Sequence, residues 1–251
     1  MTQRWKIIIQ YDGSPFCGWQ RQNHALSVQE AIEEAIFKFS GERVSIYAAG
    51  RTDAGVHALG QVAHFDLEKQ TDGKTVAGAI NAHLGDHPIS ILAAEAVDQE
   101  FHARFSALGR SYVYHLLCRQ ARPVFEKGKV WHIKHELDVK AMQEGANYLI
   151  GKHDFSSFRA ILCQAKSPIK TIDRIEFFEE DRGLEGQHIW MEIEARSFMH
   201  HQVRNIIGNL KMVGEGKWEP IKIKQVLEYK DRTKAGPTGS PDGLYFKSVI
   251  Y

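Results

Sequence analysis

The sequence predicts an α+β protein with two ferredoxin-like halves, each with the element order β-α-β-β-α-β (βαββαβ) and an antiparallel sheet. Two observations carry this prediction. Segments rich in β-branched residues alternate with segments whose apolar residues recur at helical spacing, and this order occurs twice along the 251 residues. We expect the halves to span residues 1–105 and 106–251, with the two sheets side by side and a central cleft between them.

The first half opens with a predicted strand over residues 5–11, which stops at the turn Asp12-Gly13. A helix begins at Ser27, because Ser27 and Glu30 have capping-box spacing, and it ends at Gly41, which can take the left-handed conformation. The other elements expected in this half are strands over 44–48, 61–67 and 89–97 and a helix over 75–85.

The second half repeats the pattern with longer connections but without any repeat of residues. Asp138 caps a predicted helix that Gly151 closes. The other elements expected here are strands over 111–118, 172–180, 189–196 and 242–251, a short strand near 128–134, and a helix over 199–214.

The composition points to an ordinary globular protein of the cytoplasm. No apolar run approaches the roughly 18 residues that a membrane span needs. The N-terminus enters a strand at once and carries no secretory signal. The cysteines Cys17, Cys118 and Cys163 are odd in number and scattered, so we expect reduced thiols rather than disulfides or a zinc site.

No cofactor is expected from the sequence motifs. The chain has no G-x-x-x-x-G-K-[ST], G-x-G-x-x-G or H-E-x-x-H pattern, which would indicate a nucleotide or a metal. The pairs His200-His201 and His132/His135 lack a complete ligand set, so metal binding is the weaker interpretation of these histidines.

Positive charge gathers in residues 101–135, although the whole chain has a net charge of only +1. This segment contains seven Lys or Arg and the single acid Glu126, with aromatic residues between them. Basic side chains neutralise phosphates and aromatic rings stack on bases, so the segment suits RNA. The alternative is a solvated basic surface above buried aromatic residues.

The stretch "GRTDAGVHA" (50–58) places a carboxylate, Asp53, close to Arg51 in a turn between two predicted strands. A nearby guanidinium keeps a carboxylate ionised, as a nucleophile or base requires. No second carboxylate occupies a comparable position, which argues against a glycosidase with two acids. The alternative is that Asp53 only bonds backbone N–H groups in its turn.

Two residues of the second half are further candidates. Arg204 lies on an otherwise apolar helix face, and no acid lies one turn away on that helix, so Asp53 is an attractive partner for it. Tyr112 and Tyr114 share one face of a predicted strand. They belong either to the core or to a surface on which one of them stacks on a base.

Together these residues resemble the TruA-type family of tRNA pseudouridine synthases. "GRTDAGVHA" is similar to the aspartate motif of that family. Five further blocks occur in the family's order along nearly the whole chain: "YDGSPFCGWQRQ" with "SVQEAIEEAI", "FHARFSALGRSYVYHL", "GKHDFSSFR", "SFMHHQVRNIIG" and "AGPTGSPDGLYF".

The resemblance implies an isomerase (an intramolecular transferase) that converts uridine to pseudouridine at positions 38, 39 and 40 of the tRNA anticodon stem-loop. It implies Asp53 as the catalyst, Tyr112 as the residue that stacks on the target base, and Arg204 as the partner of the acid. Arg51, beside the catalyst, is expected to contact the substrate. The resemblance also implies a homodimer that binds tRNA without any cofactor.

Two alternatives remain open at this point. One is an RNA-binding protein without catalysis, since ferredoxin-like sheets also serve that purpose. The other is a synthase of the same family that acts on a different RNA.

Overall fold

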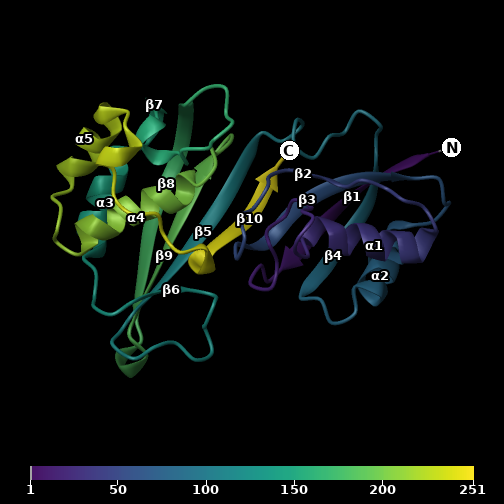
Figure 1. Cartoon of the computed structure of the whole chain (residues 1–251), viewed down its shortest axis with the longest axis horizontal. Helices are drawn as coiled ribbons and strands as arrows, with labels where there is room; N and C mark the ends of the chain where they lie inside the picture. Colours follow the sequence, from purple (N-terminus) through teal and green to yellow (C-terminus); the bar gives the residue numbers. More distant parts are fainter. Residues whose placement is uncertain (1) are drawn as a thin grey trace. The chain divides into compact units, whose positions relative to one another are not determined.

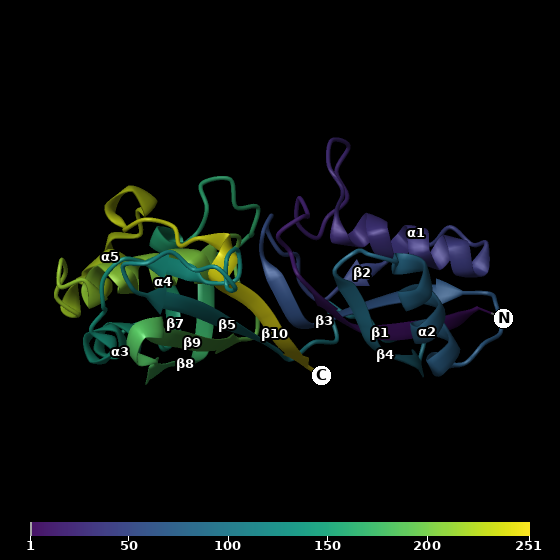
Figure 2. The ribbon, with the colours of Figure 1, turned by 90° about the horizontal axis from the view of Figure 1, so that it is seen from below.

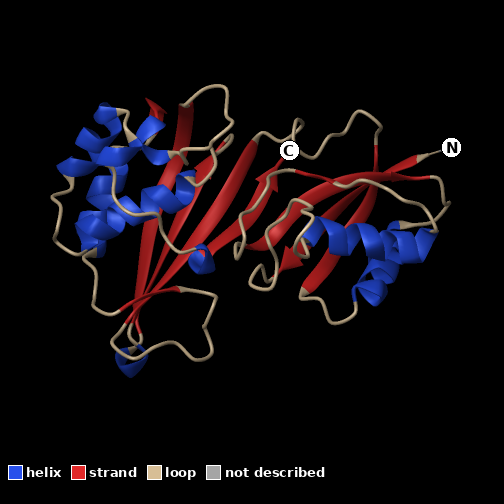
Figure 3. Cartoon of the chain, in the orientation of Figure 1, coloured by secondary structure: helices blue, strands red, loops and turns tan. Residues whose placement is uncertain are grey.

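The structure, a computed structural model, describes residues 2–251, and the chain divides into two compact units. Unit 1 comprises the described residues up to Leu108 together with Tyr245–Tyr251, and unit 2 comprises Gly109–Leu244. Both units combine helices with strands that pair mostly antiparallel, so the protein belongs to the α+β class (Figure 3). The three free cysteines form no disulfide.

The strands of unit 1 follow the order β4-β1-β3-β10, and β2 pairs with β3. Helices α1 and α2 lie side by side, and α2 packs on β4 (Figure 1). The elements are β1 (Gln3–Tyr11), α1 (Val28–Ser40), β2 (Tyr47–Ala48), β3 (His57–Leu67), α2 (Gly73–Leu84), β4 (Ile89–Val97) and β10 (Leu244–Ile250).

The ends of α1 are those that the sequence predicts. The Ser27 Oγ accepts a hydrogen bond from the Glu30 backbone N–H at 3.1 Å. Gly41 has a φ of 78° and ends the helix in the left-handed region, where its N–H donates to the Phe37 carbonyl at 2.8 Å. In the apolar stripe between these ends, Ile32 and Ile36 are fully buried.

The last strand lies in unit 1 rather than in the second half where the sequence places it. Tyr245 and Phe246 of β10 pair in parallel with His57 and Ala58 of β3. The compact units therefore differ from the predicted ranges 1–105 and 106–251 in this C-terminal segment and by three residues at the first boundary. No local sequence pattern predicts that a C-terminal strand pairs in parallel with a strand nearly 190 positions earlier.

The strands of unit 2 follow the order β7-β8-β9-β5, and β6 pairs in parallel with β5. Helices α3 and α4 lie side by side and α3 packs on β8 (Figure 2). The elements are β5 (Gly109–Cys118), β6 (Trp131–Ile133), α3 (Val139–Asn147), β7 (Gly151–Asp154), β8 (Ile169–Asp181), β9 (Gln187–Ala195), α4 (Gln202–Gly214) and α5 (Ile221–Tyr229), with short 3-10 turns between some of them.

Three expectations for the element ends are wrong. The strand predicted over 44–48 is only Tyr47–Ala48, because the residues before it pair with no neighbouring strand. The helix capped by Asp138 ends at Asn147, and Gly151, with a φ of 99°, begins β7 instead. The helix predicted over 199–214 begins only at Gln202, because His201 has a φ of 61°, outside the right-handed helical region.

Within residues 2–251, none of the helices has both the length and the apolar character needed to cross a membrane.

Candidate active site

Asp53 lies in the loop between β2 and β3 of unit 1. Its side chain is half-buried, whereas Arg51 is exposed and Thr52 is buried. The Val56 N–H donates to the Asp53 carbonyl at 3.1 Å, which closes a turn, and Gly55 within that turn has a φ of 77°. The turn that the sequence predicts at Asp53 is therefore present, and the carboxylate stands at its start.

A second loop, residues 12–19, holds the Asp53 loop in place. The Trp19 N–H donates to the Thr52 carbonyl at 3.0 Å. The Tyr11 hydroxyl lies 2.7 Å from the Thr52 hydroxyl in a hydrogen bond that is buried from solvent. Burial raises the pKa of Tyr11 to about 12, so the phenol stays neutral at physiological pH. The hydrogen bond between Tyr11 and Thr52 therefore joins two uncharged hydroxyl groups.

Two glycines let the loops meet backbone to backbone. A Cβ on Gly13 would lie 2.0 Å from the Val56 carbonyl oxygen, and a Cβ on Gly18 would lie 2.7 Å from the Thr52 carbonyl oxygen. Gly18 also has a φ of 105°, which other residues rarely adopt. Neither position can carry a side chain without moving the residues that flank Asp53.

His57 also contacts the loop over residues 12–19. The Gly13 N–H donates to its Nδ1 at 3.0 Å, and its ring stacks on Tyr245 with centroids 4.5 Å apart. The side chain is 1% exposed. In unit 1, His57 therefore fixes the entry to β3.

Tyr112 lies on β5 of unit 2, opposite Ile193 of β9. Its ring meets Phe198 edge to face, with centroids 5.1 Å apart and an interplanar angle of 86°. Tyr114 lies two residues further along the same face, and its hydroxyl donates to the Ser240 carbonyl at 2.5 Å. Burial raises the pKa of Tyr114 well above its ordinary value, so Tyr114 acts as a neutral hydrogen-bond donor within the core.

Arg204 is the third residue of α4 and is half-buried beside the buried Val203, Ile206 and Ile207. Its Nε donates to the Gly239 carbonyl at 2.9 Å, and the Gly239 N–H donates to the Arg204 carbonyl at 2.8 Å. The guanidinium is thus held at the edge of the apolar helix face by a loop, a partner that the sequence analysis did not identify.

A polar network on α4 holds this same loop, residues 235–240, and the sequence analysis missed it. The Asn205 Oδ1 accepts from the Thr238 hydroxyl at 2.7 Å and from the Arg232 guanidinium at 3.2 Å. Arg232 also donates to the Gly236 carbonyl at 2.8 Å, and the Gly236 N–H donates to the Asn209 Oδ1 at 2.8 Å. The only sequence signal for it is the glycine-rich "AGPTGS" stretch itself.

The structure brings Arg51 and Asp53 together in one loop of unit 1. It places Tyr112 and Arg204 in unit 2, where the Tyr114 hydroxyl donates to the Ser240 carbonyl and the Arg204 Nε to the Gly239 carbonyl.

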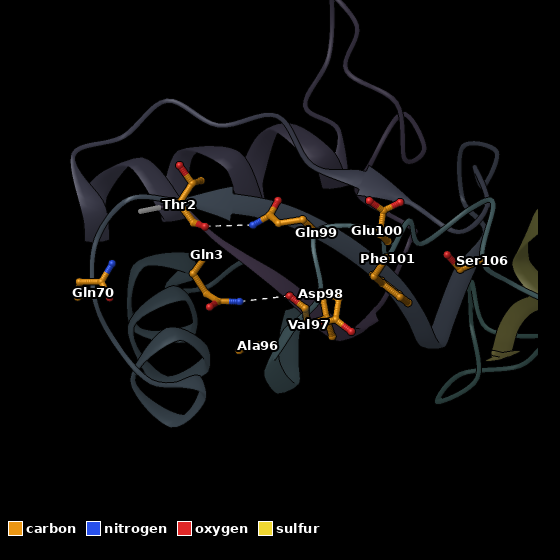
Figure 4. A pocket seen from close by; sticks show the side chains of 10 residues that line it. All are labelled: Thr2, Gln3, Gln70, Ala96, Val97, Asp98, Gln99, Glu100, Phe101 and Ser106. Carbon is orange, nitrogen blue, oxygen red and sulfur yellow. Dashed lines mark hydrogen bonds between the residues drawn. The ribbon is translucent and has the colours of Figure 1, made fainter.

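An open groove in unit 1 contains none of the predicted site residues (Figure 4). Gln3 and Gln99 cross it, since the Gln3 Nε2 donates to the Val97 carbonyl at 3.2 Å and the Gln99 Nε2 donates to the Thr2 carbonyl at 3.0 Å. Its lining is Thr2, Gln3, Gln70, Ala96, Val97, Asp98, Gln99, Glu100, Phe101 and Ser106. A lining with two acids and no base does not suit a polyanion.

Comparison with known proteins identifies the class to which this fold and this aspartate loop belong. The family model described as tRNA pseudouridine synthase matches residues 7–106 and 146–251. The chain therefore belongs to the tRNA pseudouridine synthase family. Arg51, Asp53 and Arg204 lie inside the matched ranges, and Tyr112 lies between them.

Individual relatives match the chain over nearly its full length. The chain is 50% identical to "tRNA pseudouridine synthase A" of Rhodospirillum centenum over 249 residues, which cover 99% of this chain and all of that protein. It is 50% identical to the protein of the same name from Paramagnetospirillum magneticum, over 99% of this chain and 95% of that protein. A chain of a "Cbf5-Nop10-Gar1 Complex" is 13% identical, with 95% of this chain and 47% of that chain covered and a TM-score of 0.38.

Proposed function

We propose that the protein isomerises uridine to pseudouridine in tRNA, at positions 38, 39 and 40 of the anticodon stem-loop. The observation that carries this proposal is the match to relatives named tRNA pseudouridine synthase A, at 50% identity over at least 95% of both chains. The fixed loop around Asp53, which Gly13 and Gly18 allow to pack backbone to backbone, also supports the proposal, because a reactive carboxylate must be held in one conformation.

The proposed reaction is balanced without any further reactant. The bond between ribose C1′ and uracil N1 breaks, the uracil turns, and a bond forms between C1′ and C5. The proton on C5 is lost and N1 gains one, so nothing is oxidised or reduced. The chemistry therefore needs no cofactor.

Each predicted residue has a role in this proposal. Asp53 starts the cleavage with its carboxylate, and Arg204 pairs with that carboxylate and keeps it ionised. Tyr112 stacks on the uracil, which must leave the base stack at a cost of a few kcal/mol. Arg51, exposed beside Asp53, contacts the RNA backbone.

The finer features of the architecture belong to the same proposal. We propose that each unit is a ferredoxin-like half, that the protein acts in the cytoplasm, and that two copies form a homodimer that binds tRNA. The element order β1-α1-β2-β3-α2-β4 of unit 1 supports the first of these statements.

Asp53→Asn separates an enzyme from an RNA-binding protein without activity. The proposal predicts that turnover on a tRNA transcript falls at least about a thousandfold while the Kd for the transcript changes little, because the amide keeps the shape but not the charge. Asp98 is an exposed acid of the same unit, and Asp98→Asn serves as the control. This variant should have the turnover and the Kd of the unmodified protein. Equal turnover by Asp53→Asn and the unmodified protein would contradict the role of Asp53.

A further inference from the structure

Four aromatic side chains of unit 1 form a continuous row of ring contacts, which we call the aromatic stack: Tyr47, His64, His102 and Phe105. Tyr47 lies on His64 with centroids 5.3 Å apart and an interplanar angle of 26°. The His64 and His102 ring centroids are 4.6 Å apart with the planes tilted by 60°, and the His102 and Phe105 centroids are 4.4 Å apart with the planes tilted by 41°.

In the middle of the aromatic stack His64 is buried and His102 is half-buried, while the two ends are open. His64 is 3% exposed, whereas Tyr47 is 54% exposed and Phe105 is 74% exposed. The guanidinium carbon of Arg104 lies 5.7 Å from the centre of the Phe105 ring, so a cation accompanies one open end. Large exposed aromatic rings beside a cation are typical of a binding surface rather than of a core.

Hydrogen bonds fix the two histidines in place as neutral rings. The Ala103 N–H donates to the His64 Nδ1 at 3.2 Å, and the Arg104 N–H donates to the His102 Nδ1 at 3.1 Å. Burial is the main reason that the pKa of His64 is lowered to about 4 and that the pKa of His102 is lowered. Both rings therefore act as a rigid uncharged support for the two exposed rings.

Two members of the aromatic stack, Tyr47 and His64, lie on the same β-hairpin as the Asp53 loop, whereas His102 and Phe105 follow β4. Tyr47 of β2 pairs with His64 of β3, and the loop that joins these strands contains Asp53. Tyr47 and Asp53 are six positions apart, a distance of at most about 20 Å along an extended chain. That distance equals the length of about six stacked nucleotides at about 3.4 Å each.

We infer that the aromatic stack is an RNA-binding surface on which an unpaired base of the anticodon arm stacks, within about six nucleotides of the target uridine. This inference rests on the proposed function, which supplies the RNA. Every base has a π face, so Tyr47 and Phe105 bind without reading sequence, and Arg104 contributes attraction to the phosphates. A single-stranded loop is the part of a tRNA whose bases are free to stack in this way.

The test measures the Kd of a fluorescein-labelled anticodon stem-loop RNA for four variants of the full chain. Phe105→Leu and Tyr47→Leu keep an apolar side chain but remove the ring, and each should weaken binding about tenfold. Phe105→Trp keeps a ring and should bind within about twofold of the unmodified protein. Tyr229→Leu, an exposed tyrosine of α5, is the matched control and should not change binding.

The inference is overturned if Phe105→Leu and Tyr47→Leu bind within about twofold of the unmodified protein, or if the unmodified protein does not bind the stem-loop. Equal melting temperatures of all variants exclude a loss through unfolding. Pseudouridine formation by the unmodified protein is measured on the same RNA. Its absence would refute the proposed function, while the Kd values would still decide the inference.

Discussion

Among single residues, Gly239 is the one on which the position of Arg204 depends most directly. Its backbone bonds to both the side chain and the carbonyl of Arg204. A Cβ at this position would lie 2.8 Å from the Ile207 Cγ2, 2.9 Å from the Tyr114 hydroxyl and 3.1 Å from the Arg204 carbonyl oxygen. Nothing larger than glycine fits unless the loop leaves the helix.

Gly239→Ala should therefore lower the free energy of unfolding by about 1–3 kcal/mol, measured by urea denaturation. Gly78→Ala is the control, because Gly78 lies in the interior of α2 with no atom within 4 Å of an added Cβ. This control should raise the free energy of unfolding by about 0.5–1 kcal/mol. A Gly239→Ala protein as stable as the unmodified one would show that the loop moves freely.

His64 makes the stability depend on pH. Its pKa is lowered to about 4 in the folded protein, mainly by burial, whereas the unfolded chain has the ordinary value of 6.5. Between these values the unfolded state binds the proton and the folded state does not, so the free energy of unfolding falls as the pH drops from about 6.5 to about 4. His115, whose pKa is also lowered to about 4, contributes in the same direction.

Urea unfolding at several pH values measures this effect. His64→Gln removes the titrating group, so its stability should fall less steeply with decreasing pH than that of the unmodified protein. His24→Gln, an exposed histidine of the same unit, should leave the slope unchanged. Parallel curves for His64→Gln and the unmodified protein would contradict a neutral buried His64.

At the scale of elements, α4 and the loop over residues 235–240 form one structural piece. A Cβ on Gly208 of α4 would lie 1.8 Å from the Pro237 carbonyl oxygen, so helix and loop touch through their backbones. Arg232 ties the two together through bonds to Gly236, Thr238 and Asn205. Burial lowers the pKa of Arg232.

Arg232→Ala should lower the free energy of unfolding by about 1–3 kcal/mol, because it leaves three acceptors without this donor. Chemical denaturation of the full chain measures the change. Lys234→Ala alters an exposed cation two residues away and should change the stability by less than about 0.5 kcal/mol. If both substitutions had the same small effect, the network would not hold the loop.

The elements differ in how far their sequence predicts them. Helix α1 is predicted from its cap to its final glycine because both signals are local. Helix α5 is not predicted, since its start, Ile-Lys-Ile-Lys, alternates with period two as a strand does. Its apolar residues Ile223, Val226 and Leu227 are nevertheless buried, so packing against the rest of unit 2 decides its conformation.

In the candidate site, too, some features are predicted by neighbouring residues in the sequence and others depend on residues far apart in it. Asp53 and its turn follow from a short motif, whereas the bonds from Arg204 to Gly239 and from Arg232 to Asn205 join residues 35 and 27 positions apart. Asn205 and Asn209 are fully buried although their residue types are usually exposed. Only the tertiary structure supplies the partners that make such burial possible.

At the scale of the whole molecule, the net charge of +1 conceals a basic segment in residues 101–135. Arg104, Arg122, Lys127 and Lys129 of this segment are exposed, as RNA binding requires. Family membership covers both units, since the matched ranges include 7–106 of unit 1 and 146–244 of unit 2. The proposed activity is therefore a property of the full chain.

Carbodiimide mapping of pseudouridine in an unmodified tRNA transcript tests the central claim most directly. The transcript is incubated with the unmodified protein or with Asp53→Ala. We predict marks at positions 38, 39 or 40, wherever the transcript has uridine there, with the unmodified protein alone. Marks elsewhere would indicate a synthase with a different RNA target, and no marks despite binding of the transcript would contradict the proposed activity and leave an RNA-binding protein.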